Sequence, residues 1–282
     1  MNQSDDNAFI PMTSVSDGKR RDVKPGVFYY TNQVVNVVFI GEAENWVLMD
    51  TGMPGSATQI KAAAAEHFGK DSRPKAIILT HGHFDHTGNI VALVDEWKVP
   101  VYAHPLEFPF LTGEQDYPEP DSSVEGGLLA KLSVVFPHKA INIEEALQPL
   151  PADHTMPFLK EWTWIHTPGH SPGHVSFFRK SDKVLIAGDA FVTVRQDSLY
   201  KVLVQKEEVN GPPRYLTTDW DAAKRSVIRL AALDPEIAVT GHGTTMQGEA
   251  LRQGLQKLVD EFDTMALPEH GKFVNENKQK QQ

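Results

Sequence analysis

The chain has 282 residues, of which 40% are hydrophobic and 23% charged, a composition typical of globular proteins that excludes a disordered or fibrous chain. Acidic side chains outnumber basic ones by 37 to 27, which gives a formal net charge of -10. A protein with this net negative charge repels the phosphate groups of nucleic acids, which argues against general nucleic-acid binding. There is no cysteine, so any metal ligands must come from His, Asp and Glu.

No stretch of the sequence approaches the ~20 apolar residues of a membrane span. The N-terminus also lacks the apolar core of a signal peptide. We therefore expect a soluble, cytoplasmic protein whose partner is a small-molecule substrate rather than a nucleic acid or a membrane. The sequence leaves open whether the protein forms a homodimer.

The chain opens with residues 1–24, which are polar and aperiodic and predict a flexible N-terminal segment. Three strands are expected next, and a polar turn joins the second and third as a hairpin. These strands are predicted over Val27–Tyr30, Gln33–Ile40 and Trp46–Met49.

Helices and strands then alternate. Apolar residues recur at helical spacing over Ala57–Phe68, and Gly69 is the expected stop. The apolar run Lys75–Thr80 predicts a buried strand, followed by a helix over Asn89–Trp97 and a strand over Val99–Ala103. This alternation predicts an α/β layered architecture.

The pattern breaks over residues 105–160, which hold 8 of the 19 prolines and scattered aromatic side chains. A long irregular segment inside a compact domain is usually functional or mobile. We predict an insertion within the domain and keep two interpretations open: a lid over the substrate, or a surface elaboration that covers the core.

Regular structure is expected again in the second half of the chain. The predicted strands are Trp162–His166, Val175–Arg179, Val184–Ala187 and Ile237–Thr240, and the predicted helices are Asp219–Leu233 and Gly248–Met265. We assign residues 25–270 to one domain and residues 271–282 to a polar C-terminal tail.

Three histidines and an aspartate fall within six consecutive positions: His81, His83, Asp85 and His86. On a helix these side chains would point in different directions, whereas on a loop that leaves a buried strand they can converge. Imidazole and carboxylate groups suit Zn²⁺, Mn²⁺ or Fe²⁺, and a catalytic ion usually takes three protein ligands. Four candidates in one loop therefore predict two metal ions.

Further candidates follow later strands. His170 and His174 lie in one glycine-containing turn, Asp189 follows Gly188, and His242 follows Gly241. In layered α/β folds the ends of strands are where ligands bind. These residues are therefore candidates for the same site.

This ordered set of motifs resembles the metallo-β-lactamase superfamily, whose hallmark is His-x-His-x-Asp-His followed by a separate His, an Asp and a final His. The resemblance covers about residues 25–265, and Asp50-Thr51-Gly52 matches an upstream motif of the family. It implies an α/β fold built as a four-layered αββα sandwich, with the metals in a shallow groove at one edge of the two sheets.

The resemblance also assigns residues to roles. It implies that His81, His83 and His170 hold the first metal, that Asp85, His86 and His242 hold the second, and that Asp189 bridges the two. Asp50 would be a buried carboxylate that steadies the ligand loop. His174 is expected to support the ligands or pack beside them, with direct ligation as the alternative.

Two nearby cations can share a water and lower its pKa toward ~7, which makes hydroxide available at neutral pH. The expected reaction is attack of this metal-bridging hydroxide on the carbonyl of a small ester-like substrate. Asp85 is the expected catalytic residue, because it could orient the nucleophile and pass its proton to the leaving group. We expect zinc, with manganese or iron as alternatives.

A lactone or a thioester is the favoured substrate. Homoserine-lactone lactonases share all of these ligands but place a tyrosine three positions after the bridging aspartate, where this chain has Val192. Hydroxyacylglutathione thioesterases share the ligands and a similar Thr-Pro-Gly-His turn, although their basic glutathione clamp is not evident here.

Alternatives of the same fold remain. β-Lactamases with a cysteine ligand are excluded, and the other zinc β-lactamases usually lack a counterpart of Asp189, although lactam cleavage stays open. A phosphodiesterase or nuclease would need a basic surface. A diiron oxidoreductase would carry a glutamate in place of His83.

Aromatic side chains near the ligands and in the insertion could form apolar walls for the substrate. The candidates are Phe84, Phe108, Phe110, Tyr117, Phe191 and Tyr200.

Overall fold

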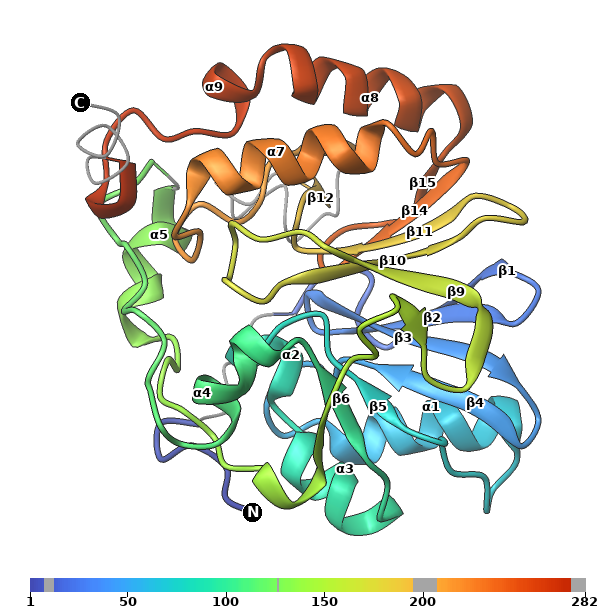
Figure 1. The fold of residues 1–282 in the computed structure, drawn as a ribbon. Helices are drawn as coiled ribbons and strands as arrows, with labels where there is room; N and C mark the ends of the chain where they lie inside the picture. The colour runs from blue at the N-terminus through green and yellow to red at the C-terminus, as the bar shows by residue number, and fades with distance from the viewer. Residues whose placement is uncertain (8–12, 126, 195–206, 275–282) are drawn as a thin grey trace. The chain divides into compact units, whose positions relative to one another are not determined.

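The structure is a computed structural model that describes residues 1–7, 13–125, 127–194 and 207–274 (Figure 1). It divides into two compact units. Unit 1 comprises Met1–Tyr117 and Pro137–Thr163, and unit 2 comprises Pro118–Phe136 and Trp164–Gln282. None of the described helices is both long and apolar enough to cross a membrane.

Unit 1 is built on a seven-stranded sheet in which sequence order equals spatial order. Its strands are β1 (Arg20–Lys24), β2 (Val27–Asn32), β3 (Val35–Glu42), β4 (Asn45–Met49), β5 (Ile77–Ile78), β6 (Val101–Ala103) and β7 (Leu147–Pro149). Strands β1 to β4 pair antiparallel, and β4 to β7 pair parallel. The expected hairpin is confirmed, but the strand Arg20–Lys24 lies within the segment predicted to be flexible.

Helices α1 (Ala57–Phe68) and α3 (Ile90–Trp97) pack on one face of this sheet (Figure 1). Alternate residues of the strands, such as Phe39 and Leu48, form a hydrophobic core with them. The predicted limits of α1 are confirmed, because its apolar stripe ends at Gly69, which adopts a left-handed conformation with φ of 100°.

Residues 105–160 do not form one irregular insertion. They contain η1 (Pro105–Glu107), α4 (Phe108–Leu111), α5 (Gly127–Leu132), η2 (Ser133–Val135), η3 (Glu144–Ala146), β7, β8 (Thr155–Met156) and the start of β9. Strand β7 extends the sheet of unit 1, Ile141 and Ile143 are buried in its core, and residues 118–136 belong to unit 2. The prolines lie between these short elements or near their ends, which is why the sequence looked irregular.

Unit 2 is built on a six-stranded sheet with the order β15-β14-β11-β10-β9-β8, whose last strand, β8, belongs to unit 1. Its strands are β9 (Leu159–His166), β10 (Val175–Arg179), β11 (Val184–Gly188), β14 (Ile237–Thr240) and β15 (Met246–Gln247). Strand β9 begins in unit 1, where it pairs with β8. Strands β12 (Val192–Val194) and β13 (Glu207–Asn210) form a separate antiparallel pair.

Helices α7 (Trp220–Ala231) and α8 (Gly248–Asp260) lie side by side over this second sheet (Figure 1). Their apolar stripes join Leu185 and Ala238 of the strands in one core. The single helix predicted over Gly248–Met265 is wrong, because the chain leaves helical geometry at Glu261 before α9 (Phe262–Met265). Phe273 and Val274 are also buried in this core, so the first residues of the predicted tail are packed.

Candidate metal centre

The histidine motif follows β5, at an edge that the parallel sheet of unit 1 creates. Strands β4 and β5 run parallel, so the residues that follow them emerge at the same edge. Asp50 follows β4, and Thr80 and His81 follow β5. The motif was expected on a loop, but only His81-Gly82-His83 is a loop, since Phe84–Thr87 forms the short helix α2.

A hydrogen-bond network joins Asp50 to two of the predicted ligands. Asp50 Oδ2 lies 2.8 Å from His86 Nδ1 and accepts a hydrogen bond of 2.8 Å from the Thr80 hydroxyl. That hydroxyl lies 3.0 Å from His81 Nδ1, and Asp50 Oδ1 accepts from the Thr80 amide at 2.8 Å. A single carboxylate therefore orients His86 directly and His81 through Thr80.

The backbone of Asp50 is left-handed, with φ of 60°, a conformation that aspartate and asparagine tolerate better than most residues. This turn directs the carboxylate toward the ligand segment and explains why Asp-Thr-Gly stands after the strand. The neighbouring Gly52 is left-handed as well, with φ of 66°.

The four predicted ligands of unit 1 lie close together. The ring centroids of His81 and His83 are 4.6 Å apart, and those of His81 and His86 are 4.2 Å apart. Ligand atoms of Asp85 and His86 lie within 4.8 Å of each other. All four side chains are buried, with at most 6% of the residue exposed.

We expect Asp50→Asn to weaken the binding of divalent metal ions by about 10- to 100-fold, the usual effect of losing a partner of a ligating histidine. Asparagine tolerates the left-handed backbone, but its amide group cannot accept hydrogen bonds at both terminal atoms. Competition with a chromophoric chelator measures the affinity. Asp22→Asn on β1 is the matched control, and a variant with wild-type affinity would show that Asp50 does not orient the ligands.

Unit 2 brings together a second set of predicted ligands. Strands β11 and β14 are parallel, so Asp189 and His242 emerge at the same edge of their sheet. His170 lies in the turn between β9 and β10. Asp189 Oδ2 is 3.5 Å from His170 Nε2 and 3.3 Å from His242 Nε2.

Threonine hydroxyls support this second set. His170 Nδ1 lies 3.1 Å from Thr217 Oγ1, whose hydroxyl donates to the carbonyl of Pro213 at 2.8 Å. His174 Nε2 accepts a hydrogen bond of 2.9 Å from the Asp189 amide, and its Nδ1 lies 2.9 Å from Thr167 Oγ1. His174 thus holds the backbone of Asp189 with the nitrogen that a ligand would offer to a metal.

The donor set fits divalent metal ions. In His81, His86 and His170 the Nδ1 atom lies within hydrogen-bond distance of an oxygen, which assigns the proton to Nδ1 and the lone pair to Nε2. In unit 2, two imidazole Nε2 atoms face one carboxylate oxygen, an arrangement that calls for a cation or a proton between them. Both sets contain residues that could hold a metal ion.

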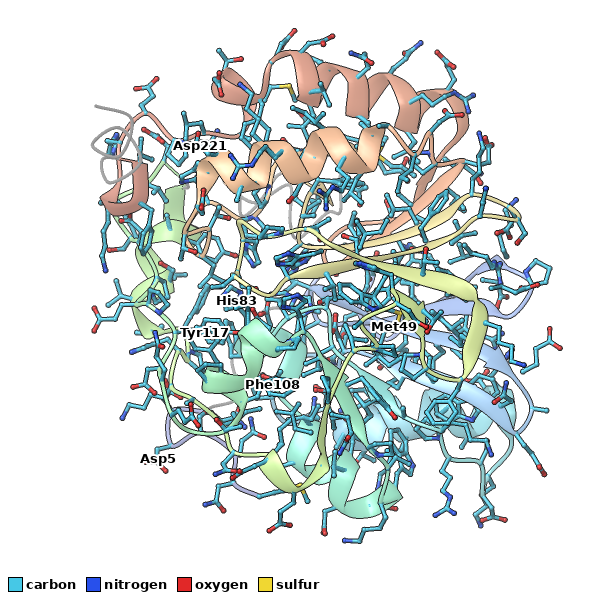
Figure 2. The ribbon with its side chains drawn as sticks, viewed as in Figure 1. Asp5, Met49, His83, Phe108, Tyr117 and Asp221 are labelled. Carbon is cyan, nitrogen blue, oxygen red and sulfur yellow. The ribbon has the colours of Figure 1, made fainter. Side chains whose placement is uncertain are left out.

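A buried glutamate and a tyrosine contact the middle of the His81-Gly82-His83 loop. The Gly82 amide donates to Glu107 Oε2 at 2.9 Å and to the Tyr117 hydroxyl at 3.0 Å, and this hydroxyl donates to Glu107 Oε2. Burial, together with the Glu107 charge, raises the pKa of Tyr117 well above its usual value, so its hydroxyl keeps its proton. Figure 2 labels His83 and Tyr117, whose ring centroids are 4.6 Å apart.

The predicted pocket residues that the structure describes are mostly buried. Phe191 is fully buried in the core of unit 2, Phe108 (Figure 2) packs against the core of unit 1, and Phe84 is 9% exposed. Phe110 stacks on Tyr117 with 3.9 Å between ring centroids. Tyr200 lies outside the described residues. The role of these side chains in binding a substrate stays a prediction.

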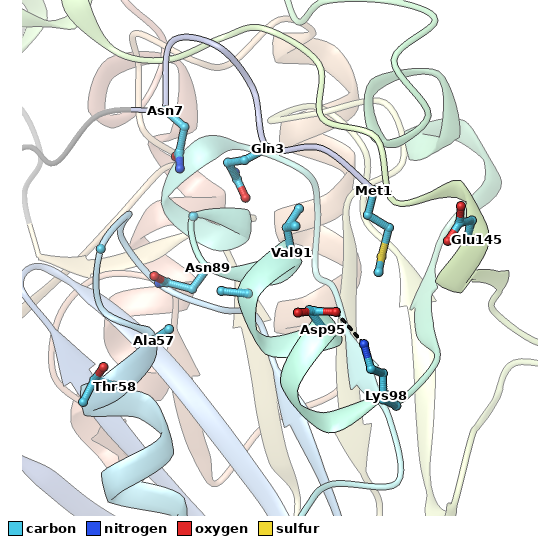
Figure 3. Close-up of a pocket in the computed structure, with 13 residues that line it drawn as sticks. Met1, Gln3, Asn7, Ala57, Thr58, Asn89, Val91, Asp95, Lys98 and Glu145 are labelled. Atoms are coloured by element: carbon cyan, nitrogen blue, oxygen red, sulfur yellow. Dashed lines mark hydrogen bonds and ion pairs between the residues drawn. The ribbon is translucent and has the colours of Figure 1, made fainter.

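Unit 1 also has a groove of about 810 Å³ (Figure 3). It lies between the N-terminal residues Met1, Gln3 and Asn7, the first turn of α1 and one side of α3 from Val91 to Lys98. None of the predicted ligands or pocket residues lines it. The groove is therefore separate from the set of ligands on the same unit.

Sequence reasoning missed the residues that hold the ligands, namely Thr80, Thr167, Thr217, Glu107 and Asn89. Asn89 accepts from the Ser56 amide and donates to the carbonyls of Thr51 and Met53, which fixes the Asp-Thr-Gly turn. Only Thr80 carried a sequence signal, because it directly precedes the motif. The others come from distant positions whose roles depend on the fold.

Comparison with known proteins agrees with these motifs. The sequence matches the metallo-beta-lactamase superfamily over residues 30–242. A Bacillus subtilis protein named probable metallo-hydrolase YflN is 46% identical over 260 residues, which cover 91% of this chain and 98% of that protein. Hydroxyacylglutathione hydrolase GloC of Haemophilus influenzae is 28% identical over 119 residues, 42% of this chain and 50% of that protein.

Among solved structures, a B3 metallo-β-lactamase with an active-site glutamic acid covers 95% of this chain and 93% of its own, with a TM-score of 0.59 and 14% identity. At this identity the likeness shows the fold alone. Together with the family match, it confirms the expected four-layered αββα fold of the α/β class. The chain belongs to the metallo-β-lactamase superfamily, and its relatives place it among the metallo-hydrolases of that superfamily.

Proposed function

We propose that the protein is a two-metal hydrolase that cleaves a small ester-like substrate, a lactone or a thioester. The proposal assigns His81, His83 and His170 to one ion and Asp85, His86 and His242 to the other, with Asp189 as the bridge. Zinc is the first choice of metal. The observation that carries it is the pattern of Nδ1 partners, which presents Nε2 as the ligand atom in both units.

Two divalent ions, when bound, lower the pKa of a shared water and polarise the substrate carbonyl. Asp85 lies on α2 next to His86, where its carboxylate can accept the proton of the attacking water. The bond from the acyl carbon to the leaving oxygen or sulfur then breaks, and Asp85 returns the proton to the leaving group. Asp50 and His174 hold His86 and Asp189 in place through the contacts described above.

Support for an acyl substrate comes from the Asp189 carboxylate, which faces the imidazoles of His170 and His242, and from the excess of acidic over basic residues. It also comes from the similarity to GloC, which is named a hydroxyacylglutathione hydrolase. β-Lactam hydrolysis is the second candidate, favoured by the fold shared with a B3 β-lactamase.

A panel of four substrates tests the proposal: a homoserine lactone, S-lactoylglutathione, nitrocefin and bis-p-nitrophenyl phosphate. We expect kcat/KM for the lactone or the thioester to exceed that for the other two at least tenfold, a difference of about 1.4 kcal/mol in the barrier. Metal analysis should give close to two equivalents per chain. Turnover of the phosphate diester alone, or a wild-type rate after complete metal removal, would contradict the proposal.

His86→Ala and His270→Ala form a matched pair for this panel. His86 is fully buried and hydrogen-bonded to Asp50, whereas the side chain of His270 is 62% exposed. The first variant should lose turnover of every substrate, and the second should retain it.

A further inference from the structure

The peptide of Gly82 separates two of the proposed ligands, His81 and His83, and two buried side chains hold it. Its amide is shared between Glu107 Oε2 at 2.9 Å and the Tyr117 hydroxyl at 3.0 Å. The hydroxyl in turn donates to the same carboxylate oxygen. The three groups form a closed ring of hydrogen bonds beside the loop.

Burying the Glu107 carboxylate costs free energy, and the Tyr117 side chain is held in place at its backbone and at its ring. Glu107 is 0% exposed, and a buried carboxylate is tolerated only when it accepts hydrogen bonds. Tyr117 is fixed at its backbone, where its amide donates to the His138 carbonyl at 2.9 Å, and at its ring, which stacks on Phe110. The pair therefore presents two oxygens to Gly82 from fixed positions.

The loop is also fitted closely to the pair. A Cβ added to Gly82 would lie 2.5 Å from the Tyr117 hydroxyl and 3.1 Å from Leu111 Cδ2. Glycine at this position is thus required by the approach of Tyr117, since Gly82 does not have a positive φ. The Tyr117 ring also contacts the His83 ring at 4.6 Å between centroids.

We propose that Glu107 and Tyr117 are a positioning pair, which fixes the Gly82 peptide and thereby sets the orientation of His81 and His83 as metal ligands. The inference rests on the proposed function, because it takes both histidines as ligands. It assigns Tyr117 to the metal centre through the loop rather than to the wall of a substrate pocket. Neither residue acts on the substrate itself.

The first test uses Tyr117→Phe and Glu107→Gln in cobalt-substituted protein. Phenylalanine keeps the stacking on Phe110 but removes the hydroxyl, and glutamine keeps the shape but removes the charge that strengthens the hydrogen bonds. We expect both variants to shift the visible absorption bands of Co²⁺ and to weaken zinc binding about tenfold in a chelator competition.

Tyr29→Phe is the matched control. Tyr29 is fully buried in β2, and its hydroxyl accepts a hydrogen bond from Arg21 at 3.3 Å. This variant should keep the cobalt bands and the zinc affinity. If Tyr117→Phe and Glu107→Gln behaved like Tyr29→Phe, with only KM or thermal stability altered, the positioning role would be overturned in favour of a pocket or core role.

The second test is a rescue. Gly82→Ala should distort the loop because its Cβ comes closest to the Tyr117 hydroxyl, and Gly82→Ala combined with Tyr117→Phe removes this closest atom. We expect the double variant to bind zinc more tightly than Gly82→Ala alone. Equal or weaker binding by the double variant would count against the pair.

Different results would contradict the proposed substrate class and the positioning pair. If the wild-type protein binds two metals but hydrolyses neither lactone nor thioester, the proposed substrate class is wrong while the positioning pair stands on the cobalt spectra. If the wild type binds no metal, both are overturned.

Discussion

Asp189→Ala is expected to lower kcat/KM at least about 10³-fold, a loss of roughly 4 kcal/mol of transition-state stabilisation. Its Oδ2 atom lies 3.5 Å from His170 Nε2 and 3.3 Å from His242 Nε2, so its removal leaves two imidazoles without the carboxylate that they face. Loss of a proposed bridging ligand should cost more metal affinity than the 10- to 100-fold typical of residues that only support a ligand.

Steady-state kinetics and the metal content of the purified variant measure this effect together. Asp234→Ala is the control, because its carboxylate binds Lys183 at the surface of the same unit. A fully active Asp189→Ala protein with two equivalents of metal would show that this residue does not bridge the ions. Asp189→Asn is a useful companion, since it keeps the side-chain volume while removing the charge.

Gly169→Ala is expected to destabilise the protein by about 3 kcal/mol or more, through two additive causes. The residue has φ of 132°, which disfavours a side chain, and an added Cβ would lie 2.3 Å from the Ala223 amide nitrogen and 2.5 Å from Ala223 Cα. These atoms belong to the first turn of α7. The Gly169 carbonyl also accepts from the amides of Thr218 and Asp219, so the turn cannot move away without breaking the start of the helix.

Thermal unfolding of the metal-free protein measures this loss. At about 2–4 °C per kcal/mol, the midpoint should fall by roughly 6–12 °C. Gly69→Ala is the matched control, since Gly69 also has positive φ, at 100°, but no atom lies within 4 Å of its added Cβ. The control should lose only the contribution of the backbone conformation, roughly 1–2 kcal/mol. Equal losses in the two variants would exclude the steric contribution.

The sequence predicted elements best where a local signal was decisive. The helix Ala57–Phe68 has an apolar stripe and a glycine stop, and its limits agree with the structure. The hairpin of β3 and β4 is marked by β-branched residues on both sides of a polar turn, and it is also confirmed. Both signals are local in the sequence and need no knowledge of the rest of the fold.

Prediction was wrong where the local sequence pattern does not indicate the structure that forms. Leu147–Pro149 became strand β7 because β6 offers it a parallel edge, which no local pattern indicates. Arg20–Lys24 is polar, yet it pairs with β2. The break at Glu261 divides a sequence that is amphipathic on both sides.

At the candidate metal centre, the sequence indicated the ligands but not the residues that support them. The ligand candidates could be named because histidine and aspartate beside glycine are conspicuous in the sequence. Their supports could not, since Thr217 is 47 residues from His170 and Glu107 is 25 residues from Gly82. Threonine and glutamate are common residues, and only the fold shows which of them meets a ligand.

Strand direction in both sheets has a practical consequence for attaching probes. In each parallel pair, β4 with β5 and β11 with β14, the candidate metal ligands and their partners follow the C-terminal ends of the strands. The turns at the other end, at residues 43–44 before β4 and 180–183 before β11, carry exposed side chains such as Glu44 and Lys180. A dye or an immobilisation tag placed there is separated from the reactive groups by the full length of a strand.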